Sequence, residues 1–467
     1  MDYNWLEMQA GMRPEKTAVI FNGNMLSFRE LYEEALSVSK KLNALRRRRI
    51  GFFIDNTVEA AILIHAAMLS GIELVMINRR LTVVEIDSQM KDVEVDTIVA
   101  TKKISMDGYR VFIYADLDGL QDVHDNEKAV SGKDALSIMF TSGTTGRAKA
   151  VRQSYENHYE SAIGCEQRFR YGPDSIWMNV NPIYHISGFS ILMRSVIRGC
   201  TMILIEKFEP LNVWQELEKY KVTHVSMVPV MLGRMMEHEG RHNLEGILLG
   251  GAGVTMDILD RALERGFPVY NSFGMTETCS QIVSISPEDP KILKGTVGRP
   301  LDNISIRIDE ENEGELLVKG PAVTTGYVNA ELSLDEGYFR TGDIGRIDDE
   351  GYLYILDRRS DLIISGGENI YPKEIEDAAA AHASVRKSVA IKQKDAEWGE
   401  VPVLLIELEA GSGLDRTAVM AVLEQRLARY KLPKEIHETE EVIMTSTGKV
   451  SRARNREAFE RKKSSSI

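Results

Sequence analysis

Short apolar runs alternate with amphipathic stretches along much of the chain. The run Ile50–Ile54 is followed by the amphipathic stretch Val58–Leu69 and by a second apolar run, Leu74–Ile77. Such runs predict buried strands, and the stretches between them predict helices. The same alternation predicts further elements at Val83–Met90, Thr97–Ala100, Thr201–Glu206, Asn212–Tyr220, Val222–Val228, Gly246–Leu249, Met256–Arg265 and Pro268–Ser272. Strands that alternate with helices indicate βαβ units and parallel sheet.

The pattern changes near residue 304 to short strands separated by turn residues, which indicates a β-rich subdomain. An α+β pattern follows after residue 358. The expected elements are strands at Ile304–Ile308, Glu315–Lys319, Tyr352–Leu356, Ser388–Lys392 and Val403–Glu409, and helices at Pro372–Ala381 and Arg416–Leu427. We therefore predict an α/β protein with two domains, residues 1–357 and residues 358–467.

Length and charge narrow the kinds of function to consider. The chain has 467 residues, which is longer than one ordinary domain, and its composition of 43% hydrophobic and 27% charged residues is that of a globular protein. With 70 acidic against 57 basic residues the net charge is -13, which opposes general attraction to nucleic acid or to an anionic membrane. An anionic ligand must therefore be held by a local site.

Three cysteines, Cys165, Cys200 and Cys279, lie far apart and show neither metal-ligand spacing nor a disulfide framework. The N-terminus has no signal segment, and no stretch approaches the ~18 apolar residues that would span a bilayer. We expect a cytoplasmic protein without membrane insertion. A homo-oligomer is compatible with the sequence.

A loop rich in glycine and hydroxyl residues follows the apolar strand Ala135–Phe140. Its sequence is Thr141-Ser142-Gly143-Thr144-Thr145-Gly146-Arg147-Ala148-Lys149. Glycine permits close approach of the backbone, so such a loop can surround phosphate oxygens with N–H groups and hydroxyls. The Walker spacing of Gly, four residues and Gly-Lys-Ser/Thr is absent, which excludes a P-loop NTPase.

Two further motifs could bind a nucleotide. In Ser272-Phe273-Gly274-Met275-Thr276-Glu277, the aromatic ring could stack on a purine, the threonine could bond a phosphate oxygen, and the glutamate could bind Mg²⁺. In Tyr338-Phe339-Arg340-Thr341-Gly342-Asp343, a turn presents a carboxylate that could accept both ribose hydroxyls. Taken alone, Asp343 could equally cap the turn.

Two more motifs lie near the expected domain boundary and near the C-terminus. The first is Asp357-Arg358-Arg359-Ser360-Asp361-Leu362-Ile363-Ile364-Ser365-Gly366-Gly367-Glu368-Asn369-Ile370-Tyr371-Pro372, and the second is Thr447-Gly448-Lys449. Most of the five motifs have ordinary structural explanations when isolated. Their occurrence together and in this order does not.

The ordered set resembles the adenylate-forming superfamily of acyl-CoA synthetases, peptide-synthetase adenylation domains and luciferases, over essentially the whole chain. The resemblance implies a large N-terminal adenylate-forming domain and a small, mobile C-terminal domain. It implies that Thr141–Lys149 grips the β- and γ-phosphates of ATP and that Gly251, Ala252 and Phe273 flank adenine. Further implied roles are Thr276 and Glu277 at the phosphate and Mg²⁺, Asp343 and Arg358 at the ribose, Gly366 and Gly367 at the pantetheine of coenzyme A, and Lys449 as the mobile catalytic lysine.

The acyl pocket is assigned from the motif Pro182-Ile183-Tyr184-His185-Ile186-Ser187-Gly188. His185 matches the aromatic-or-histidine position beside that pocket in the superfamily, and the resemblance makes it catalytic together with Lys449 and Thr276. Within the superfamily, Tyr184–Gly188, Ser272–Gln281 and Leu356–Pro372 are most similar to the o-succinylbenzoyl-CoA synthetases of menaquinone biosynthesis.

The substrate of those synthetases, 2-succinylbenzoate, carries two carboxylates, so the one that does not react needs a cation or oriented donors. Arg194 is our candidate, with Ser280 and Gln281 as polar partners. Arg194 could equally be a surface helix residue.

Two departures from the superfamily pattern are visible. The phosphate loop usually continues Pro-Lys-Gly but reads Ala148-Lys149-Ala150 here, and the usual Asp or Lys hinge is Ser360. The first departure removes some rigidity from the loop but keeps the lysine. The second leaves the expected pivot in place with a different residue.

The implied function is ATP-dependent activation of a carboxylic acid as its acyl-AMP, followed by transfer to coenzyme A, with ATP, Mg²⁺ and coenzyme A as cofactors and the acid as the other small-molecule partner. The nearest alternatives are another aryl- or acyl-CoA ligase and an adenylation enzyme that loads a carrier protein. A catalytically silent binding protein with the same fold is a third, which intact Lys149, Glu277, Asp343, Arg358 and Lys449 oppose.

Overall fold

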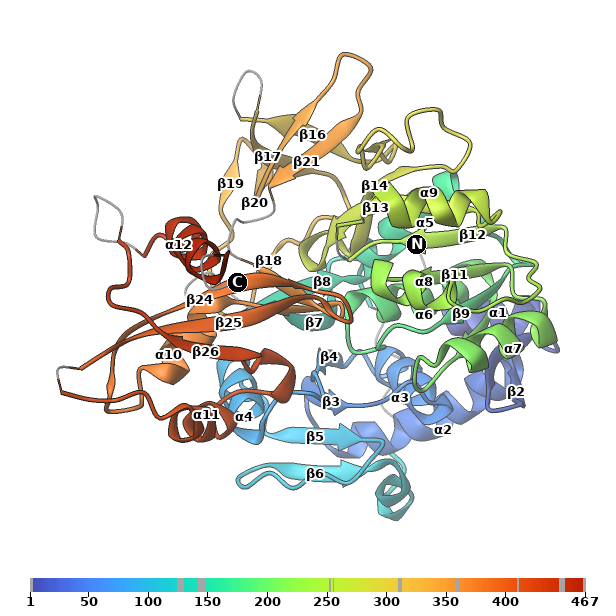
Figure 1. Cartoon of the computed structure of the whole chain (residues 1–467). Coiled ribbons are helices and arrows are strands. Elements are labelled where there is room, and N and C mark those ends of the chain that lie inside the picture. The colour runs from blue at the N-terminus through green and yellow to red at the C-terminus, as the bar shows by residue number, and fades with distance from the viewer. Residues whose placement is uncertain are drawn as a thin grey trace. The chain divides into compact units, whose positions relative to one another are not determined.

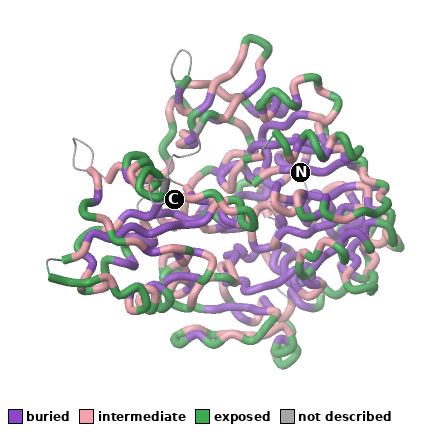
Figure 2. The backbone as a smooth tube through the Cα atoms, in the orientation of Figure 1, coloured by how far each residue is buried: buried purple, intermediate pink, exposed green. Residues whose placement is uncertain are grey.

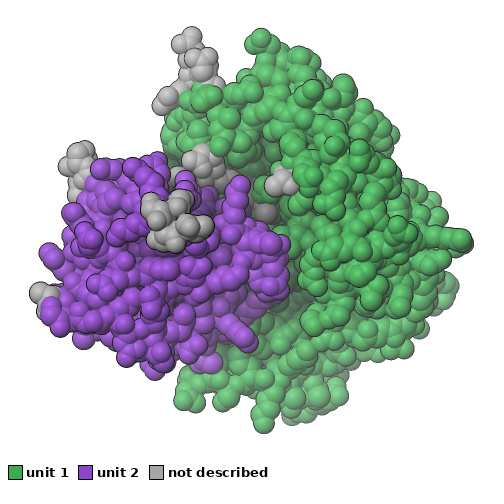
Figure 3. Space-filling model, in the orientation of Figure 1, with its two compact units in different colours: residues 1–79, 90–140, 150–356 green, residues 80–89, 141–149, 357–467 purple. Residues whose placement is uncertain are grey.

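The computed structural model describes residues 3–123, 130–141, 148–251, 253–254, 256–309, 313–357, 362–409, 411–444 and 450–464. The chain divides into two compact units (Figure 3). The first comprises residues 1–79, 90–140 and 150–356, and the second comprises residues 80–89, 141–149 and 357–467. The second unit thus includes two short segments from the N-terminal half. The sequence-based domain boundary at residues 357 and 358 stays a prediction.

Two large sheets carry most of the first unit (Figure 1). The order of the nine-stranded sheet is β15 (Arg299–Pro300), β14 (Ser280–Ile285), β13 (Val269–Met275), β12 (Gly246–Leu249), β11 (His224–Met227), β9 (Ile176–Asn179), β10 (Thr201–Leu204), β1 (Thr17–Phe21) and β2 (Asn24–Ser27). The order of the seven-stranded sheet is β18 (Gly326–Tyr327), β8 (Lys149–Ser154), β7 (Ala135–Thr141), β4 (Glu73–Met76), β3 (Arg49–Phe53), β5 (Thr97–Ala100) and β6 (Arg110–Ile113).

The prediction of parallel sheet is confirmed. Neighbouring strands from β13 to β1 are parallel, and so are those from β7 to β6. Their strands are apolar because both faces of a parallel sheet are covered. β4, β5, β10, β11 and β12 are buried at every position.

Local sequence explains where the helices of this unit begin. Ser27 and Glu30 form a capping box at the start of α2 (Phe28–Ala44), and the Thr57 hydroxyl accepts the Ala60 N–H at the start of α3 (Val58–Leu69). α3 has the bounds that the sequence predicts. The remaining helical segments are α1 (Trp5–Met12), η1 (Tyr114–Gly119), α5 (Tyr155–Phe169), α6 (Ile186–Arg198), α7 (Pro210–Tyr220), α8 (Pro229–Met235), α9 (Met256–Glu264) and η2 (Thr276–Thr278). Helix α4 (Val83–Asp92) belongs for the most part to the second unit.

Buried residues are frequent along the strands of the first unit (Figure 2). The largest core cluster joins the two parallel sheets. It combines side chains of α2, α3, α5 and α6 with side chains of β3, β4, β7, β9 and β10, including the fully buried Phe52 and Trp177. Helices α5 and α6 therefore lie in the interior of the unit. Residues Gly188 to Val196 of α6 are all buried.

The predicted β-rich subdomain is confirmed. Its sheet runs β16 (Ser305–Ile308), β17 (Gly314–Lys319), β20 (Tyr338–Ile347) and β19 (Leu334–Asp335), with β21 (Leu353–Asp357) also paired to β20. Phe273, Leu316 and Leu353 share a core cluster that connects this sheet to β13. The segment expected as a turn at Asp343 lies instead inside the long strand β20, where the pairing with β17 is interrupted.

The second unit has its own sheet and core. The sheet runs β23 (Glu368–Ile370), β22 (Ile363–Ser365), β25 (Gly399–Leu408) and β24 (Val385–Asp395), with β26 (Glu435–Glu438) parallel to β25. Its helical segments are α10 (Pro372–Ala379), α11 (Arg416–Glu424), η3 (Arg429–Lys431) and α12 (Arg452–Ser464). β24 and β25 extend beyond the predicted apolar segments because hairpin pairing continues through polar residues.

The three cysteines are described, buried and free of disulfide bonds, as the sequence predicts. In the described part of the chain, no helix combines the length and apolar character needed to cross a membrane.

Candidate active site

Two glycine-containing segments leave adjacent parallel strands at the same edge of the nine-stranded sheet. Gly250 and Gly251 follow β12, and the Ser272–Glu277 motif lies at the end of β13, which pairs with β12. The Ser272 hydroxyl donates to the Leu249 carbonyl oxygen at 2.9 Å, and Gly251 has a positive φ of 80°. Loops at the carboxyl edge of a parallel sheet are where such folds bind ligands. Ala252 lies outside the described residues.

Residues distant in the sequence hold both the backbone of Thr276 and Glu277 and the Glu277 side chain. Gln153 on β8 donates its amide N–H to the Thr276 carbonyl oxygen at 2.7 Å, and Thr324 N–H donates to the Glu277 carbonyl oxygen at 2.7 Å. The Tyr327 hydroxyl donates to Glu277 Oε1 at 3.1 Å. The Glu277 carboxylate is thus buried and oriented by the protein.

Glu277 would serve as a single protein ligand to Mg²⁺. The described residues contain no cluster of three or more His, Cys, Asp or Glu side chains that could enclose a metal ion. Mg²⁺ commonly binds through one or two carboxylates and completes its shell with phosphate oxygens and water. A single buried carboxylate at the end of the Ser272–Glu277 motif fits that chemistry, and the metal role of Glu277 stays a prediction.

Phe273 is 2% exposed and belongs to the core cluster of the β-rich subdomain. Its proposed contact with adenine stays a prediction. Its neighbour Gly274 cannot be replaced, because a Cβ there would lie 2.0 Å from the Ser280 carbonyl oxygen. This close approach brings Ser280 and Gln281 of β14 against the end of the motif.

Ser280 has an unusual backbone. Its φ is 100°, and the preceding residue Cys279 has a φ of 50°. A non-glycine residue with such a φ is strained, and strain of this kind concentrates at functional sites. The adjacent Gln281 is buried, and neither its side-chain oxygen nor its side-chain nitrogen has a hydrogen-bond partner. Both observations are consistent with a polar ligand beside β14.

His185 is the N-cap residue of α6, and its ring centroid lies 4.7 Å from that of Tyr184. Gly188 permits the tight start of this helix, because a Cβ there would lie 2.3 Å from the Pro182 carbonyl oxygen. The motif thus places His185 at the helix N-terminus. Its catalytic role stays a prediction.

Arg194 lies two turns further along α6 and is 1% exposed, so the alternative that it is a surface residue is wrong. Its guanidinium lies 5.6 Å from the Trp177 ring, and its Nε and Nη2 atoms have no hydrogen-bond partner. No ion pair of Arg194 occurs within the described residues. A buried cation without a counter-charge is costly unless a ligand supplies one.

The pKa values of three buried side chains indicate which elements lie near Arg194. Burial and then the Arg194 charge lower the pKa of His158 to about 3. Burial raises the pKa of Cys165 to about 11 and also raises that of Cys279, while the Arg194 charge opposes both changes. His158 and Cys165 lie on α5, and Cys279 directly precedes β14. Helix α5 and the residue before β14 therefore contribute buried side chains that lie near Arg194 of α6.

Asp343 is buried on β20, at the interruption of its pairing with β17. Its N–H donates to the Thr341 hydroxyl at 3.1 Å, and that hydroxyl donates to the Leu316 carbonyl oxygen at 2.9 Å. The ribose contact of Asp343 stays a prediction.

Among the described residues, four of the predicted site residues belong to the second unit. Thr141 ends β7 and Lys149 begins β8, and both are half-buried. Gly366 and Gly367 form the turn between β22 and β23, with φ values of 56° and 87°, and Gly366 N–H donates to the Trp398 carbonyl oxygen at 2.8 Å. A second set of predicted residues lies outside the described residues: Ser142, Gly143, Thr144, Thr145, Gly146, Arg358, Ser360 and Lys449.

Sequence reasoning missed the residues that support the site. Gln153 and Ser137 belong to a buried chain in which the Ser137 hydroxyl lies 2.8 Å from His158 Nε2 and donates to Gln153 Oε1 at 2.6 Å. Tyr327, which contacts Glu277, is likewise absent from the predicted motifs. No periodicity marks these residues, because each acts on a segment more than 15 positions away along the chain.

Comparisons with known proteins identify the family of the chain. Residues 6–328 match the AMP-binding enzyme family, and residues 374–449 match the AMP-binding enzyme C-terminal domain. A 2-succinylbenzoate–CoA ligase from Staphylococcus epidermidis is 42% identical over 462 residues, covering 96% of each chain. A ligase of the same name from Staphylococcus aureus is 39% identical over 490 residues, covering 97% of this chain and 99% of that one.

Solved structures are also similar. An o-succinylbenzoate CoA synthetase from Bacillus subtilis, a double mutant bound to a product analogue, is 33% identical with a TM-score of 0.93, covering 97% of this chain and 98% of that one. The same synthetase in complex with ATP and magnesium ion is 32% identical with a TM-score of 0.75, over 96% of this chain and 98% of that one. On the family match and the near full-length relatives, the chain belongs to the AMP-binding enzyme family.

Proposed function

We propose that the chain is an ATP-dependent acid–CoA ligase that converts 2-succinylbenzoate to 2-succinylbenzoyl-CoA through an acyl-AMP, as a step of menaquinone biosynthesis. The observation that carries the substrate assignment is the buried, unpaired guanidinium of Arg194. The names of the relatives in Staphylococcus and Bacillus support the same reaction.

Arg194 favours a substrate with a second carboxylate. An acid with one carboxylate presents that group to ATP and leaves Arg194 without a counter-charge. In a dicarboxylic acid, the group that does not react can accept hydrogen bonds from Nε and Nη2, which have no partner in the protein. Hydrogen bonds to charged groups contribute about 1.5–3 kcal/mol. The unpaired amide of Gln281 is available for another polar atom of the same substrate.

The nucleotide roles follow the motifs. Thr141–Lys149 would hold the phosphates, Gly251, Ala252 and Phe273 would flank adenine, and Asp343 with Arg358 would bind the ribose. Glu277 would hold Mg²⁺, which neutralises phosphate charge when bound. Tyr327 keeps the Glu277 carboxylate in one orientation.

The first half-reaction joins the substrate carboxylate to the α-phosphate of ATP and releases pyrophosphate. The protein contributes orientation and charge stabilisation, since no covalent enzyme intermediate is needed. Thr276 and His185 would orient the phosphate and the acid, and Lys449 would stabilise the charge that develops. In the second half-reaction the thiol of coenzyme A attacks the acyl carbonyl and AMP leaves. Gly366 and Gly367 would line the pantetheine path.

A panel of carboxylic acids tests this function. AMP release is measured with and without coenzyme A for 2-succinylbenzoate, benzoate and fatty acids. We expect 2-succinylbenzoate to have the highest kcat/KM and thioester formation to require coenzyme A. Preference for a monocarboxylic acid would indicate another acyl-CoA ligase. Acid-dependent ATP–pyrophosphate exchange without use of coenzyme A would indicate carrier loading, and absence of exchange with every acid would indicate a silent binding protein.

A further inference from the structure

Strand β20 is irregular in the segment that contains Asp343. β17 and β20 pair at Leu317 and Arg340 and again at Glu315 and Ile344. Between these two pairs, Leu316 alone lies opposite the three residues Thr341 to Asp343. β20 therefore contains a bulge with two extra residues. Bulges redirect side chains and leave backbone groups without ladder partners, and they are frequent beside active sites.

Glu315 supplies the partner that the bulge removes. Its Oε1 accepts the Gly342 N–H at 2.7 Å, at a residue whose φ is 77°. Thr341 completes the turn by linking Asp343 N–H to the Leu316 carbonyl oxygen. Two N–H groups of the bulge, those of Gly342 and Asp343, are thus linked to β17 through the side chains of Glu315 and Thr341. The conformation that presents Asp343 thus depends on Glu315.

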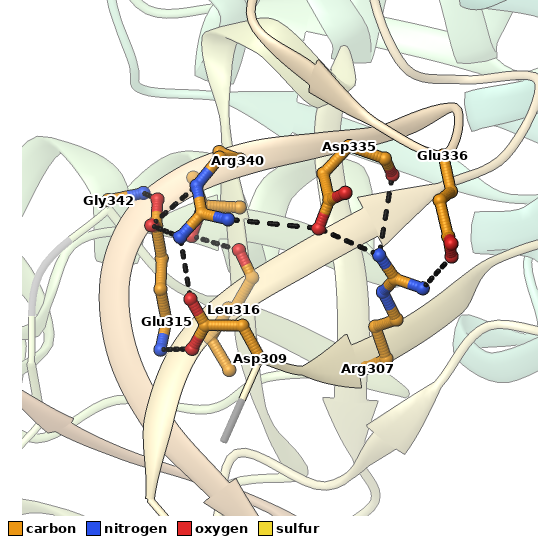
Figure 4. A network of polar contacts seen from close by, with 9 residues as sticks. Arg307, Asp309, Glu315, Leu316, Asp335, Glu336, Arg340 and Gly342 are labelled. Carbon is orange, nitrogen blue, oxygen red and sulfur yellow. Dashed lines mark hydrogen bonds and ion pairs between the residues drawn. The ribbon is translucent and has the colours of Figure 1, made fainter.

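The second oxygen of Glu315 is also held. Arg340 donates from Nε to Glu315 Oε2 at 2.9 Å, and its Nη2 lies 2.6 Å from Asp309 Oδ2. Asp309 Oδ1 in turn accepts the Glu315 N–H at 2.7 Å. Figure 4 shows Arg340 between these carboxylates, with Asp335 on its other side. Both oxygens of Glu315 are therefore fixed, one by the bulge and one by the arginine.

The outer part of the network, around Arg307, makes none of the contacts to the bulge described above. Arg307 lies 2.8 Å from Asp335 Oδ2 and 2.7 Å from Glu336 Oε2. The Glu336 side chain is 77% exposed. Among the contacts in Figure 4, Glu336 is joined to Arg307 alone. Glu315 and Glu336 are thus two carboxylates of one network. Glu315 contacts Gly342 in the bulge, whereas Glu336 contacts Arg307.

We propose that Glu315 is a positioning residue for the nucleotide: it holds the bulge at Thr341–Asp343 so that the Asp343 carboxylate meets the ribose hydroxyls. This proposal rests on the proposed function, in which Asp343 binds the ribose. A small displacement of a carboxylate weakens two hydrogen bonds at once, because both depend on the same geometry. Loss of Glu315 should therefore reduce affinity only for nucleotides that carry ribose hydroxyls.

The test compares binding of ATP and of 2′,3′-dideoxy-ATP by calorimetry, in the presence of Mg²⁺ and without any acid. The variants are Glu315→Ala, which removes both contacts, Glu315→Gln, which keeps an acceptor for Gly342, and the matched control Glu336→Gln. We expect Glu315→Ala to weaken ATP binding about tenfold, Glu315→Gln to weaken it less, and both to leave dideoxy-ATP within about twofold of wild type. Glu336→Gln should change neither affinity.

Thermal unfolding of each variant confirms that it is folded. An equal loss for both nucleotides would show that Glu315 supports the subdomain in general, and no loss for either would show that the bulge holds without it; each result overturns the proposal. A wild-type protein that binds both nucleotides equally would overturn the ribose contact of Asp343, and the positioning role with it. Because no acid is present, a failure to activate 2-succinylbenzoate would be a separate result that concerns the proposed function alone.

Discussion

Two arginines of the first unit have opposite surroundings. Arg194, on α6, is fully buried and has no ion pair within the described residues, whereas Arg340, on β20, is in contact with Asp309, Glu315 and Asp335. Carboxylates of the protein balance the charge of Arg340, so this arginine connects the segments that carry them. A buried cation without a balancing charge is unfavourable unless a ligand completes it. The difference is the basis of two separate proposals, a substrate contact for Arg194 and a positioning role for the network of Arg340.

The largest expected effect comes from removing the unpaired arginine. Arg194→Met keeps the side-chain volume but loses the charge, so KM for 2-succinylbenzoate should rise about 10- to 150-fold, corresponding to ~1.5–3 kcal/mol. KM for ATP should stay within about twofold. Steady-state kinetics with 2-succinylbenzoate and with an analogue that lacks the unreactive carboxylate measures this. An equal loss with the analogue would mean that Arg194 has only a structural role.

The stability of the protein at low pH should also depend on the surroundings of Arg194, because its charge lowers the pKa of His158. The pKa of His158 and that of His65 are both lowered to about 3, His158 by burial and then by the Arg194 charge, and His65 by burial alone. Because the unfolded chain takes up protons near pH 6.5 and the folded chain does not, stability falls as the pH decreases below 6.5. Each histidine should remove about 2 kcal/mol between pH 6.5 and pH 5.

In Arg194→Met, the pKa of His158 should rise while that of His65 stays unchanged, since only His158 is influenced by the arginine. Urea unfolding at both pH values and NMR titration of the two imidazoles measure these effects. A shift of equal size at both histidines would indicate a general loosening of the core.

Removing the paired arginine should have a smaller effect on a different substrate. Arg340→Met leaves Glu315 without its charged partner, so the bulge should loosen and KM for ATP should rise about fivefold. KM for 2-succinylbenzoate should not change. The effect is moderate because the network is partly exposed to solvent, which weakens ion pairs. A larger effect on the acid than on ATP would contradict the comparison.

The smallest effect is expected at the outer end of the network. Arg307→Gln removes the pairs with Asp335 and Glu336 but leaves Glu315 and Arg340 in contact. KM for ATP should stay within about twofold of wild type and the melting temperature within about 2 °C, as for most surface substitutions. Steady-state kinetics and thermal unfolding, with Arg340→Met measured in parallel, give KM for ATP and the melting temperature. An effect as large as that of Arg340→Met would show that the network acts as one unit.

The order and type of most elements could be predicted from the amino-acid sequence. α3 has its predicted bounds, and the alternation of apolar and amphipathic segments correctly indicated parallel sheets followed by a β-rich part. This works because apolar periodicity reflects which faces become buried, and caps such as Ser27 with Glu30 act within a few residues. The ordered motifs were likewise sufficient for the family, since they lie at fixed places along the chain.

The residues that support the candidate site could not be predicted from the sequence, because packing brings them together. Arg194 could be read as a surface residue until α5, α6 and the start of β14 enclosed it, and Asp343 could be read as a turn residue until the pairing of β17 and β20 placed it on a bulge. Glu315 and Gly342 are 27 positions apart, and Tyr327 and Glu277 are 50 apart. Contacts over such separations depend on strand register and on packing between sheets, which leave no periodic trace in the local sequence.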